Sequence, residues 1–384
     1  MTYIPYLKRA FLVLLVVTAA LMSAVSVSGQ TMDDRPLYRA VVLSVEDAPA
    51  GELHSDFPTQ YAHLEILNGP YEGSVVTSET VITGNPYYDM ILESGQRILV
   101  HAQVEGETVQ FHPAEFVRDR TVFWLVAVFF ILLVAIGGIQ GLKTLLSLGI
   151  MGILVLYVML PLLLAGWNPL VVTIGITSLG ALVFLLLIGG ASRKTAAAIG
   201  GTISGLLFGG ILATLAGSAA NLTGLSSAEA QILQYLGPGI DFRGLLFSGI
   251  ILGALGAALD VGMSIASSMD QIQQANPDIS TQALLQRGFN VGRDVLGTMA
   301  NTLILAYVGS SLPLLLLFHW QDARWGDLLH MDLIASEMVR ALAGSIGLAF
   351  AVPATAVLAA WMFRPGRQTR RQSKVDASFS SSRD

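Results

Sequence analysis

Cysteine is absent from this chain of 384 residues, and charged side chains make up only 12% of it. A chain without cysteine forms no disulfide, no thiolate nucleophile and no cysteine-ligated metal site. The six histidines fall outside the long apolar runs and show no HExxH spacing, which excludes the usual zinc protease. A P-loop sequence is also missing, so nucleotide-driven work would need another subunit. We expect no metal and no cofactor.

Apolar residues, in contrast, make up 53% of the chain. Several apolar runs reach about 20 residues, which is the length that an α-helix needs to cross a bilayer. We therefore expect a membrane all-α bundle of about seven transmembrane helices, with an N-terminal signal anchor or signal peptide and a small exported all-β domain. The expected spans are 121–141, 143–165, 169–190, 195–217, 243–268, 295–318 and 337–362.

The chain divides into four predicted parts. Residues 1–30 carry two basic residues before an apolar run, which fits a cleaved signal peptide or an uncleaved signal anchor, and either one would export the next segment. Residues 31–117 form the exported β-rich domain. The seven-helix domain comes next at 121–363, and the basic, serine-rich tail 364–384 is expected to be disordered and cytoplasmic.

The exported part reads as short strands separated by turn sequences. Its size suits an OB-like fold, a small barrel or a sandwich. His101 and His112 could meet across a hairpin, although solvated strand histidines are the simpler interpretation. The expected strands are 37–45, 61–67, 74–82, 97–104 and 108–111.

Basic residues predict the orientation, because cytoplasmic loops of membrane proteins are enriched in lysine and arginine. With Lys8 and Arg9 inside, the basic groups at Lys143, at 193–194 and at 287–293 also fall inside. The alternation of loops then closes over the seven spans. This places the β-rich domain outside and the C-terminus in the cytoplasm.

A polar constellation interrupts the hydrocarbon of the fifth and sixth predicted spans. Asp260 is a lone carboxylate in the fifth span, and Asn301 lies at a similar depth in the sixth. We expect the two to face each other, since consecutive spans joined by one loop are usually neighbours. The remaining candidates for a substrate or ion pathway are Ser264, Thr298, Arg293 and Asp294.

Two interpretations of Asp260 stay open. A bare charge in hydrocarbon costs about 3 kcal/mol or more, so the carboxylate could be a proton- or ion-sensitive group on a wet pathway. Alternatively, it could form a hydrogen bond that holds two helices in register.

Small residues at helical spacing predict close helix packing in two spans. The glycines expected in helix packing are Gly201, Gly205, Gly209, Gly249, Gly253 and Gly256.

An ion pair is expected at the start of the last span. Glu337 and Arg340 lie three residues apart there, which is the spacing of an ion pair on one helix face.

Three stretches of the chain resemble the YibE/F-like family of bacterial multi-spanning membrane proteins. They are GALGAALDVGMSIASSMDQI from Gly253, GFNVGRDVLGTMANTLILAYVGSSLPLLLL from Gly288 and LAGSIGLAFAVPATA from Leu342. A weaker resemblance extends from about residue 37 to 362. The resemblance implies a bacterial inner-membrane protein with an exported N-terminal domain, and it supplies no substrate and no catalytic residue.

The function we expect is that of a transporter or permease-like protein with a buried polar site near the inner third of the bilayer. The alternative is a membrane scaffold or sensor whose exported domain binds a protein partner. An intramembrane aspartyl protease would need a second carboxylate at the depth of Asp260, so we do not expect an enzyme. The lipid bilayer is the expected partner, a homo-oligomer could form, and no nucleic acid is expected.

The absence of cysteine makes the predicted topology directly testable. Single cysteines at Ser55, Ser280 and Ser373 would have no native competitor. An impermeant maleimide added to intact cells with a permeabilised outer membrane should label Ser55→Cys alone. Labelling of Ser280→Cys under these conditions would contradict the orientation.

Overall fold

The computed structural model divides the chain into two compact units, with the boundary between Ile136 and Gly137. The sequence predicted the boundary between the β-rich domain and the helical domain at residues 117–121, so the observed division lies about 15 residues further along the chain. The predicted signal segment and tail lie outside the described residues, which are 36–48, 57–87, 89–105, 108–237, 239–321 and 324–363.

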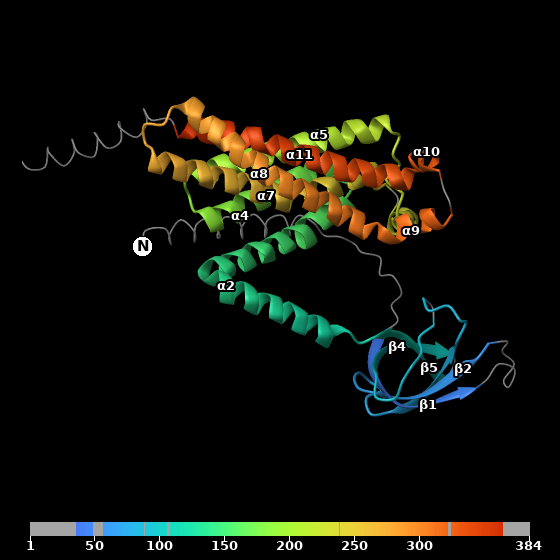
Figure 1. Cartoon of the computed structure of the whole chain (residues 1–384). Helices are drawn as coiled ribbons and strands as arrows, with labels where there is room; N and C mark the ends of the chain where they lie inside the picture. The colour runs from blue at the N-terminus through green and yellow to red at the C-terminus, as the bar shows by residue number, and fades with distance from the viewer. Residues whose placement is uncertain are drawn as a thin grey trace, which may run out of the picture. The chain divides into compact units, whose positions relative to one another are not determined.

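The first unit contains a five-stranded antiparallel sheet of order β3-β2-β1-β4-β5 (Figure 1). Alternate side chains of β2 are buried, as expected for a strand with one face on a core. Ser78 of β3 donates a hydrogen bond to the Phe111 carbonyl of β5, at 2.6 Å, so the two edge strands approach each other and the sheet curls. The strands are β1 (Leu37–Ala48), β2 (Thr59–Ile66), β3 (Val75–Val81), β4 (Arg97–Glu105) and β5 (Thr108–Phe116).

An aromatic cluster closes the core of this unit. Tyr38, Tyr71 and Phe111 meet edge to face, with ring centroids 5.3–6.3 Å apart. His101 and His112 are direct partners in the β4–β5 ladder. Among the described residues, no group of three or more His, Asp and Glu side chains could hold a metal ion.

The helical part opens with one long helical run that glycine interrupts. α2 (Asp119–Leu154) continues through a π-helical turn (Val155–Met159) into α3 (Leu160–Leu164). Gly138 has φ 54° and ψ −129°, a backbone conformation that L side chains rarely adopt. The break therefore falls at Gly138, and the predicted boundary between spans 121–141 and 143–165 was about four residues too late.

The bundle in the second unit is built from helices that run back and forth. Five helices, or helical runs, of the described chain are long and apolar enough to cross a membrane, and a bent pair, α8 and α9, would make a sixth. The prediction of about seven spans counted the two arms of α2 separately. The remaining helices are α4 (Pro169–Gly189), α5 (Arg193–Ala219), α6 (Ala228–Leu236), α7 (Phe242–Ala275), α8 (Thr281–Ser310), α9 (Leu312–Trp320), α10 (Trp325–Leu328) and α11 (Asp332–Met362).

The sixth predicted span begins and ends differently from the prediction. Ser280 caps α8 by accepting a hydrogen bond from the Ala283 backbone N–H, at 3.2 Å. Much of the connector between the predicted spans 243–268 and 295–318 is therefore the first part of α8 itself. After Ser310 the chain bends by 60° into α9, where Pro313 stands in the first turn.

The contact between α5 and α11 is the closest helix approach in the bundle. A Cβ added at Gly205 would lie 2.7 Å from the Ala351 Cβ and 2.9 Å from the Gly347 carbonyl oxygen. One added at Gly201 would lie 2.7 Å from the Thr355 Cα, and one at Gly209 would lie 3.2 Å from the Ala343 carbonyl oxygen. The two backbones therefore touch along three turns, as the glycine spacing in α5 predicts.

α7 lies between these two helices and the outer ones, and it contacts α4, α5, α8 and α11. Thr202 of α5 donates a hydrogen bond to the Ala258 carbonyl of α7 at 3.1 Å, in the buried core. The prediction for the glycines of α7 was wrong in part. A Cβ at Gly249 or Gly256 would meet nothing within 4 Å, because these residues line the one side of α7 that no described helix covers.

Glycines 205 and 256 provide a matched pair for a stability test. Gly205→Ala should destabilise the protein by about 1–3 kcal/mol, because the methyl group forces packed backbones apart. Gly256→Ala should leave stability unchanged or raise it slightly, since alanine is the better helix former. Melting temperatures in detergent measure both. Equal melting temperatures for the two variants would show that α5 and α11 do not pack as described.

Candidate functional site

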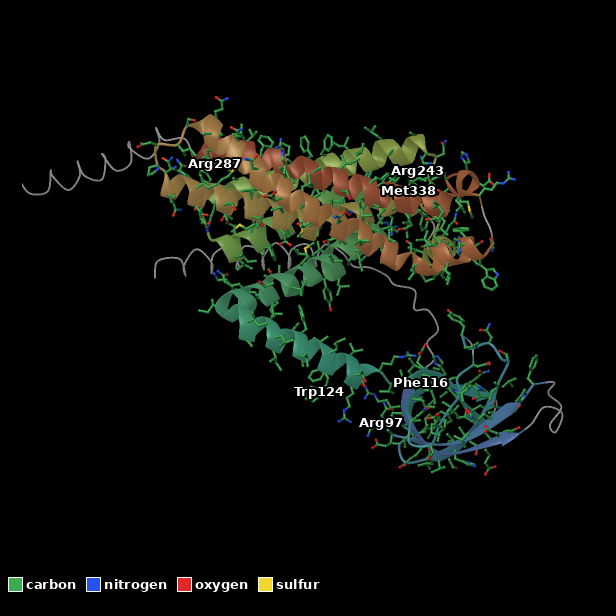
Figure 2. The ribbon with its side chains drawn as sticks, viewed as in Figure 1. Arg97, Phe116, Trp124, Arg243, Arg287 and Met338 are labelled. Carbon is green, nitrogen blue, oxygen red and sulfur yellow. The ribbon has the colours of Figure 1, made fainter. Side chains whose placement is uncertain are left out.

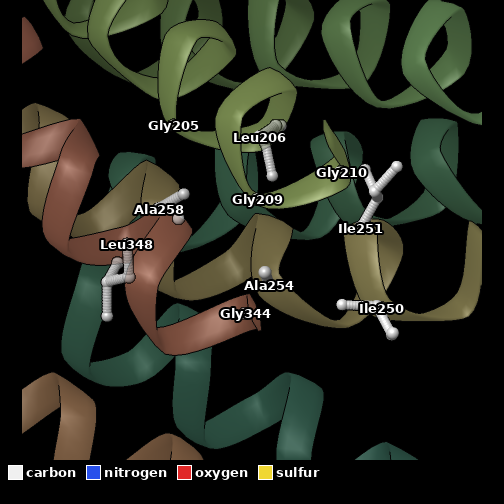
Figure 3. Close-up of a pocket in the computed structure, with 11 residues that line it drawn as sticks. Gly205, Leu206, Gly209, Gly210, Ile250, Ile251, Ala254, Ala258, Gly344 and Leu348 are labelled. Atoms are coloured by element: carbon white, nitrogen blue, oxygen red, sulfur yellow. The ribbon is translucent and has the colours of Figure 1, made fainter. Parts of the chain in front are cut away.

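The seam between α5, α7 and α11 is closed. The cavity at their junction measures about 10 Å³, which is the lower limit for a single water molecule. Its walls are aliphatic side chains and glycine backbone from the three helices (Figure 3). A polar solute has no room here, so a site for one must lie on another face of these helices.

The two ends of the bundle carry different basic residues. Arg287 of α8 lies near one end of the bundle and Arg243 of α7 at the other (Figure 2). The start of α5, with Arg193 and Lys194, shares the end of Arg287, because α5, α7 and α8 alternate in direction. The segregation of basic groups between ends is the pattern from which the orientation was predicted.

Asp260 lies near the middle of α7 on its uncovered face. Its side chain is exposed, and Ser264, one turn further along, is exposed too. Within the described part of the chain, Asp260 takes part in no hydrogen bond or ion pair. The sequence predicted that Asp260 is buried, and this is wrong for the bundle described here. Asp260 forms part of an open strip with Gly253 and Gly256.

Contacts on either side of Asp260 show which part of α8 lies level with it. A Cβ at Gly253 would lie 3.0 Å from the Tyr307 hydroxyl, and one at Gly292 would lie 3.3 Å from the Ile265 side chain. Because the two helices are antiparallel, the residues of α8 level with Asp260 fall between Gly292 and Tyr307. Asn301 and Thr298 therefore lie close to the depth predicted for them.

The predicted contact between Asp260 and Asn301 is nevertheless not formed. Asn301 and Thr298 are exposed, and no hydrogen bond joins Asn301 to Asp260 among the described residues. The reason is the face that α8 uses. Gly288 and Gly292 bring α8 against α7 and α11, and Asn301 lies nine residues after Gly292, which is half a turn at about 100° per residue.

Arg293 and Asp294 are both exposed on α8. In the described ranges neither residue forms an ion pair, so Arg293 is not paired with Asp260. Gly292, which directly precedes them, packs against Ile265 of α7 and Val352 of α11. Both side chains are exposed and form part of the outer surface of α8.

A second polar group lies near the end of the bundle where α11 begins. It consists of the predicted ion pair of Glu337 and Arg340 and of Tyr307, which was not predicted. Arg340 and Glu337 of α11 form an ion pair of 3.1 Å, with side chains 34% and 23% exposed. The Tyr307 hydroxyl of α8 is buried and has no hydrogen-bond partner among the described residues. A tyrosine inside an apolar span, six residues beyond Asn301, is the signal that could have identified it.

Together these residues define the polar face of α7, a strip that runs from Tyr307, over Gly253 and Gly256, to Asp260 and Ser264. Gly253 and Asp260 are separated by seven residues, or roughly 10 Å along the helix at 1.5 Å per residue. The strip offers a hydroxyl, a carboxylate and space above glycine. It can accept a proton or a cation at Asp260, while the Tyr307 hydroxyl at its other end is buried.

The long apolar helices define a multi-pass membrane protein. The family model described as YibE/F-like protein matches residues 125–365, and the chain belongs to this family. The match confirms the resemblance and covers the helical region, while the β-sheet lies outside it. The comparisons with curated proteins and with solved structures found no match.

Proposed function

We propose that this protein is a transporter of small polar or charged solutes in the bacterial cytoplasmic membrane, and that Asp260 lies on the transport pathway. In this proposal the β-sheet unit faces outside and the C-terminus lies in the cytoplasm, as the distribution of basic residues suggests. The observation that carries the proposal is a carboxylate in the middle of an apolar helix that no described residue covers or pairs with.

A carboxylate in hydrocarbon has a high free energy, and this favours an aqueous path beside Asp260. Charged side chains at membrane depth are rare, and they line water-filled cavities or pair with other groups. Asp260 has no partner among the described residues, and the face that carries it has no side chain above Gly249 and Gly256. A face in contact with lipid would need no such space and would not tolerate the carboxylate, so an aqueous path is the better explanation.

The chemistry of the strip supports a proton- or cation-coupled step. The Asp260 carboxylate can hold a proton, or it can replace part of the hydration shell of a cation. Tyr307 and the Glu337–Arg340 pair extend the polar groups toward the end where α11 begins. A solute on this route would exchange one set of polar contacts for another without entering bare hydrocarbon.

The opposite wall of such a path must come from outside the bundle described here. A second copy of the chain could supply it, since glycines at helical spacing let a second helix approach closely. The expectation of a homo-oligomer is therefore part of the proposal.

Transport can be measured in liposomes with the purified protein. A pH gradient should drive accumulation of at least one member of a panel of radiolabelled small ions, organic acids and amino acids. Asp260→Asn should lower the initial rate by about tenfold or more, which corresponds to about 1.4 kcal/mol of barrier. Asp278→Asn is the matched control, because Asp278 is exposed in the connector between α7 and α8.

The result is read together with melting temperatures, which should be the same for both variants. Accumulation no greater than in liposomes without protein, for every member of the panel, would remove the basis for a transporter. Accumulation that is unchanged by Asp260→Asn would keep the transporter and remove Asp260 from its pathway.

A further inference from the structure

An open groove lies at the end of the bundle where α5 begins. It is formed by the last turns of α4, the first turns of α5 and the last turn of α11, and its volume is about 580 Å³. This is within the range of small-ligand sites, which measure about 300–1,000 Å³. The groove is separate from the polar face of α7, because α7 contributes no residue to it.

The walls of the groove are aliphatic and its rim is cationic. Leu182 and Leu186 of α4 and Ile199 of α5 line the groove, and Arg193, which also lines it, is exposed. Lys194 comes directly after Arg193 in the first turn of α5; it is half-buried and lies beside the groove without lining it. Neither basic residue forms an ion pair within the described chain, and none of the residues that line the groove is acidic.

Trp361 completes the groove on the α11 side. Its side chain is 48% exposed, two residues before the end of the described chain at Phe363. Tryptophan, arginine and lysine together mark the depth of lipid headgroups, where an aromatic ring and a cationic tip both find suitable surroundings. Ile199 lies six residues beyond Arg193, or roughly 9 Å deeper along α5. The groove therefore runs from headgroup depth into the hydrocarbon.

We infer that this groove is a binding site for an anionic phospholipid. The phosphate would lie at Arg193 and Lys194, and one acyl chain would run along Leu182, Leu186 and Ile199 below Trp361. A free inorganic anion would gain nothing from the aliphatic walls, and a neutral lipid would leave the two cations without a counter-charge. Basic pockets between transmembrane helices recognise anionic headgroups by this combination.

Lipid binding can be followed in vesicles through the fluorescence of Trp361. The variant used would keep Trp361 and carry phenylalanine at Trp124, Trp167, Trp320 and Trp325. Phosphatidylglycerol with brominated acyl chains should quench Trp361 at lower mole fraction than brominated phosphatidylcholine does. Each single substitution, Arg193→Gln or Lys194→Gln, should reduce this preference by about fivefold, which is about 1 kcal/mol per basic group.

Arg287→Gln with Arg293→Gln provides the matched control. It removes the same charge from the same end of the bundle but touches no residue of the groove, and it should retain the preference. Equal quenching by the two lipids in the parent variant would overturn the inference. The inference would also be overturned if the preference for phosphatidylglycerol survived the double substitution Arg193→Gln with Lys194→Gln. A third contradicting result is a loss of preference in the Arg287→Gln, Arg293→Gln control that is as large as in the Arg193→Gln, Lys194→Gln variant. Neither arm depends on transport, so the result is independent of the proposed function.

Discussion

The backbone contact between α5 and α11 is the interaction on which the rest of the bundle depends. Glycines at every fourth residue of α5 remove the side chains that would hold the helices apart, and carbonyl oxygens and Cα atoms of α11 occupy the space. In a bilayer the lipid tails are as apolar as leucine, so helix association relies on such close packing rather than on the hydrophobic effect. Small residues are therefore placed where the packing must be tightest.

This contact also determines which face of α7 is used. α7 packs its larger side chains, such as Phe247 and Ile251, against glycines 217 and 210 of α5. Three of its own glycines, Gly249, Gly253 and Gly256, are exposed on the other side, together with Asp260. The same residue type thus serves two purposes in neighbouring helices: in α5 it permits contact, and in α7 it leaves a surface open above a carboxylate. The Asp260 carboxylate of α7 lies outside the packed core as a consequence.

Much of the fold could be predicted because periodicity and turn chemistry act locally. The strands of the first unit and the helices α4, α5 and α11 are encoded by apolar runs bounded by cap residues such as Asn168 and Ser192. The break in α2 was misplaced because Gly137, Gly138 and Gly141 look alike in sequence, and only the backbone shows which one has positive φ. The length of α8 was not predicted, because its first 14 residues are polar enough to lie outside the apolar run that begins at residue 295.

The candidate site was predicted less well, for a physical reason. Sequence spacing shows which residues share a face of one helix, but it does not show which face packs. Asp260 and Asn301 were placed at similar depths, yet Gly288 and Gly292 select the opposite side of α8 as its contact surface. Tyr307 was overlooked because its hydroxyl becomes notable only when α7 and α11 surround it.

The central claim is that the Asp260 face of α7 meets water within the membrane, and a cysteine one turn from Asp260 tests it most directly. Ser264→Cys would be compared with Val357→Cys, an exposed apolar position of α11, in liposomes treated with a charged, water-soluble methanethiosulfonate. The account predicts rapid modification at 264 and slow modification at 357. Slow modification at both positions, with rapid reaction of both toward a lipid-soluble maleimide, would place Asp260 against hydrocarbon and contradict it.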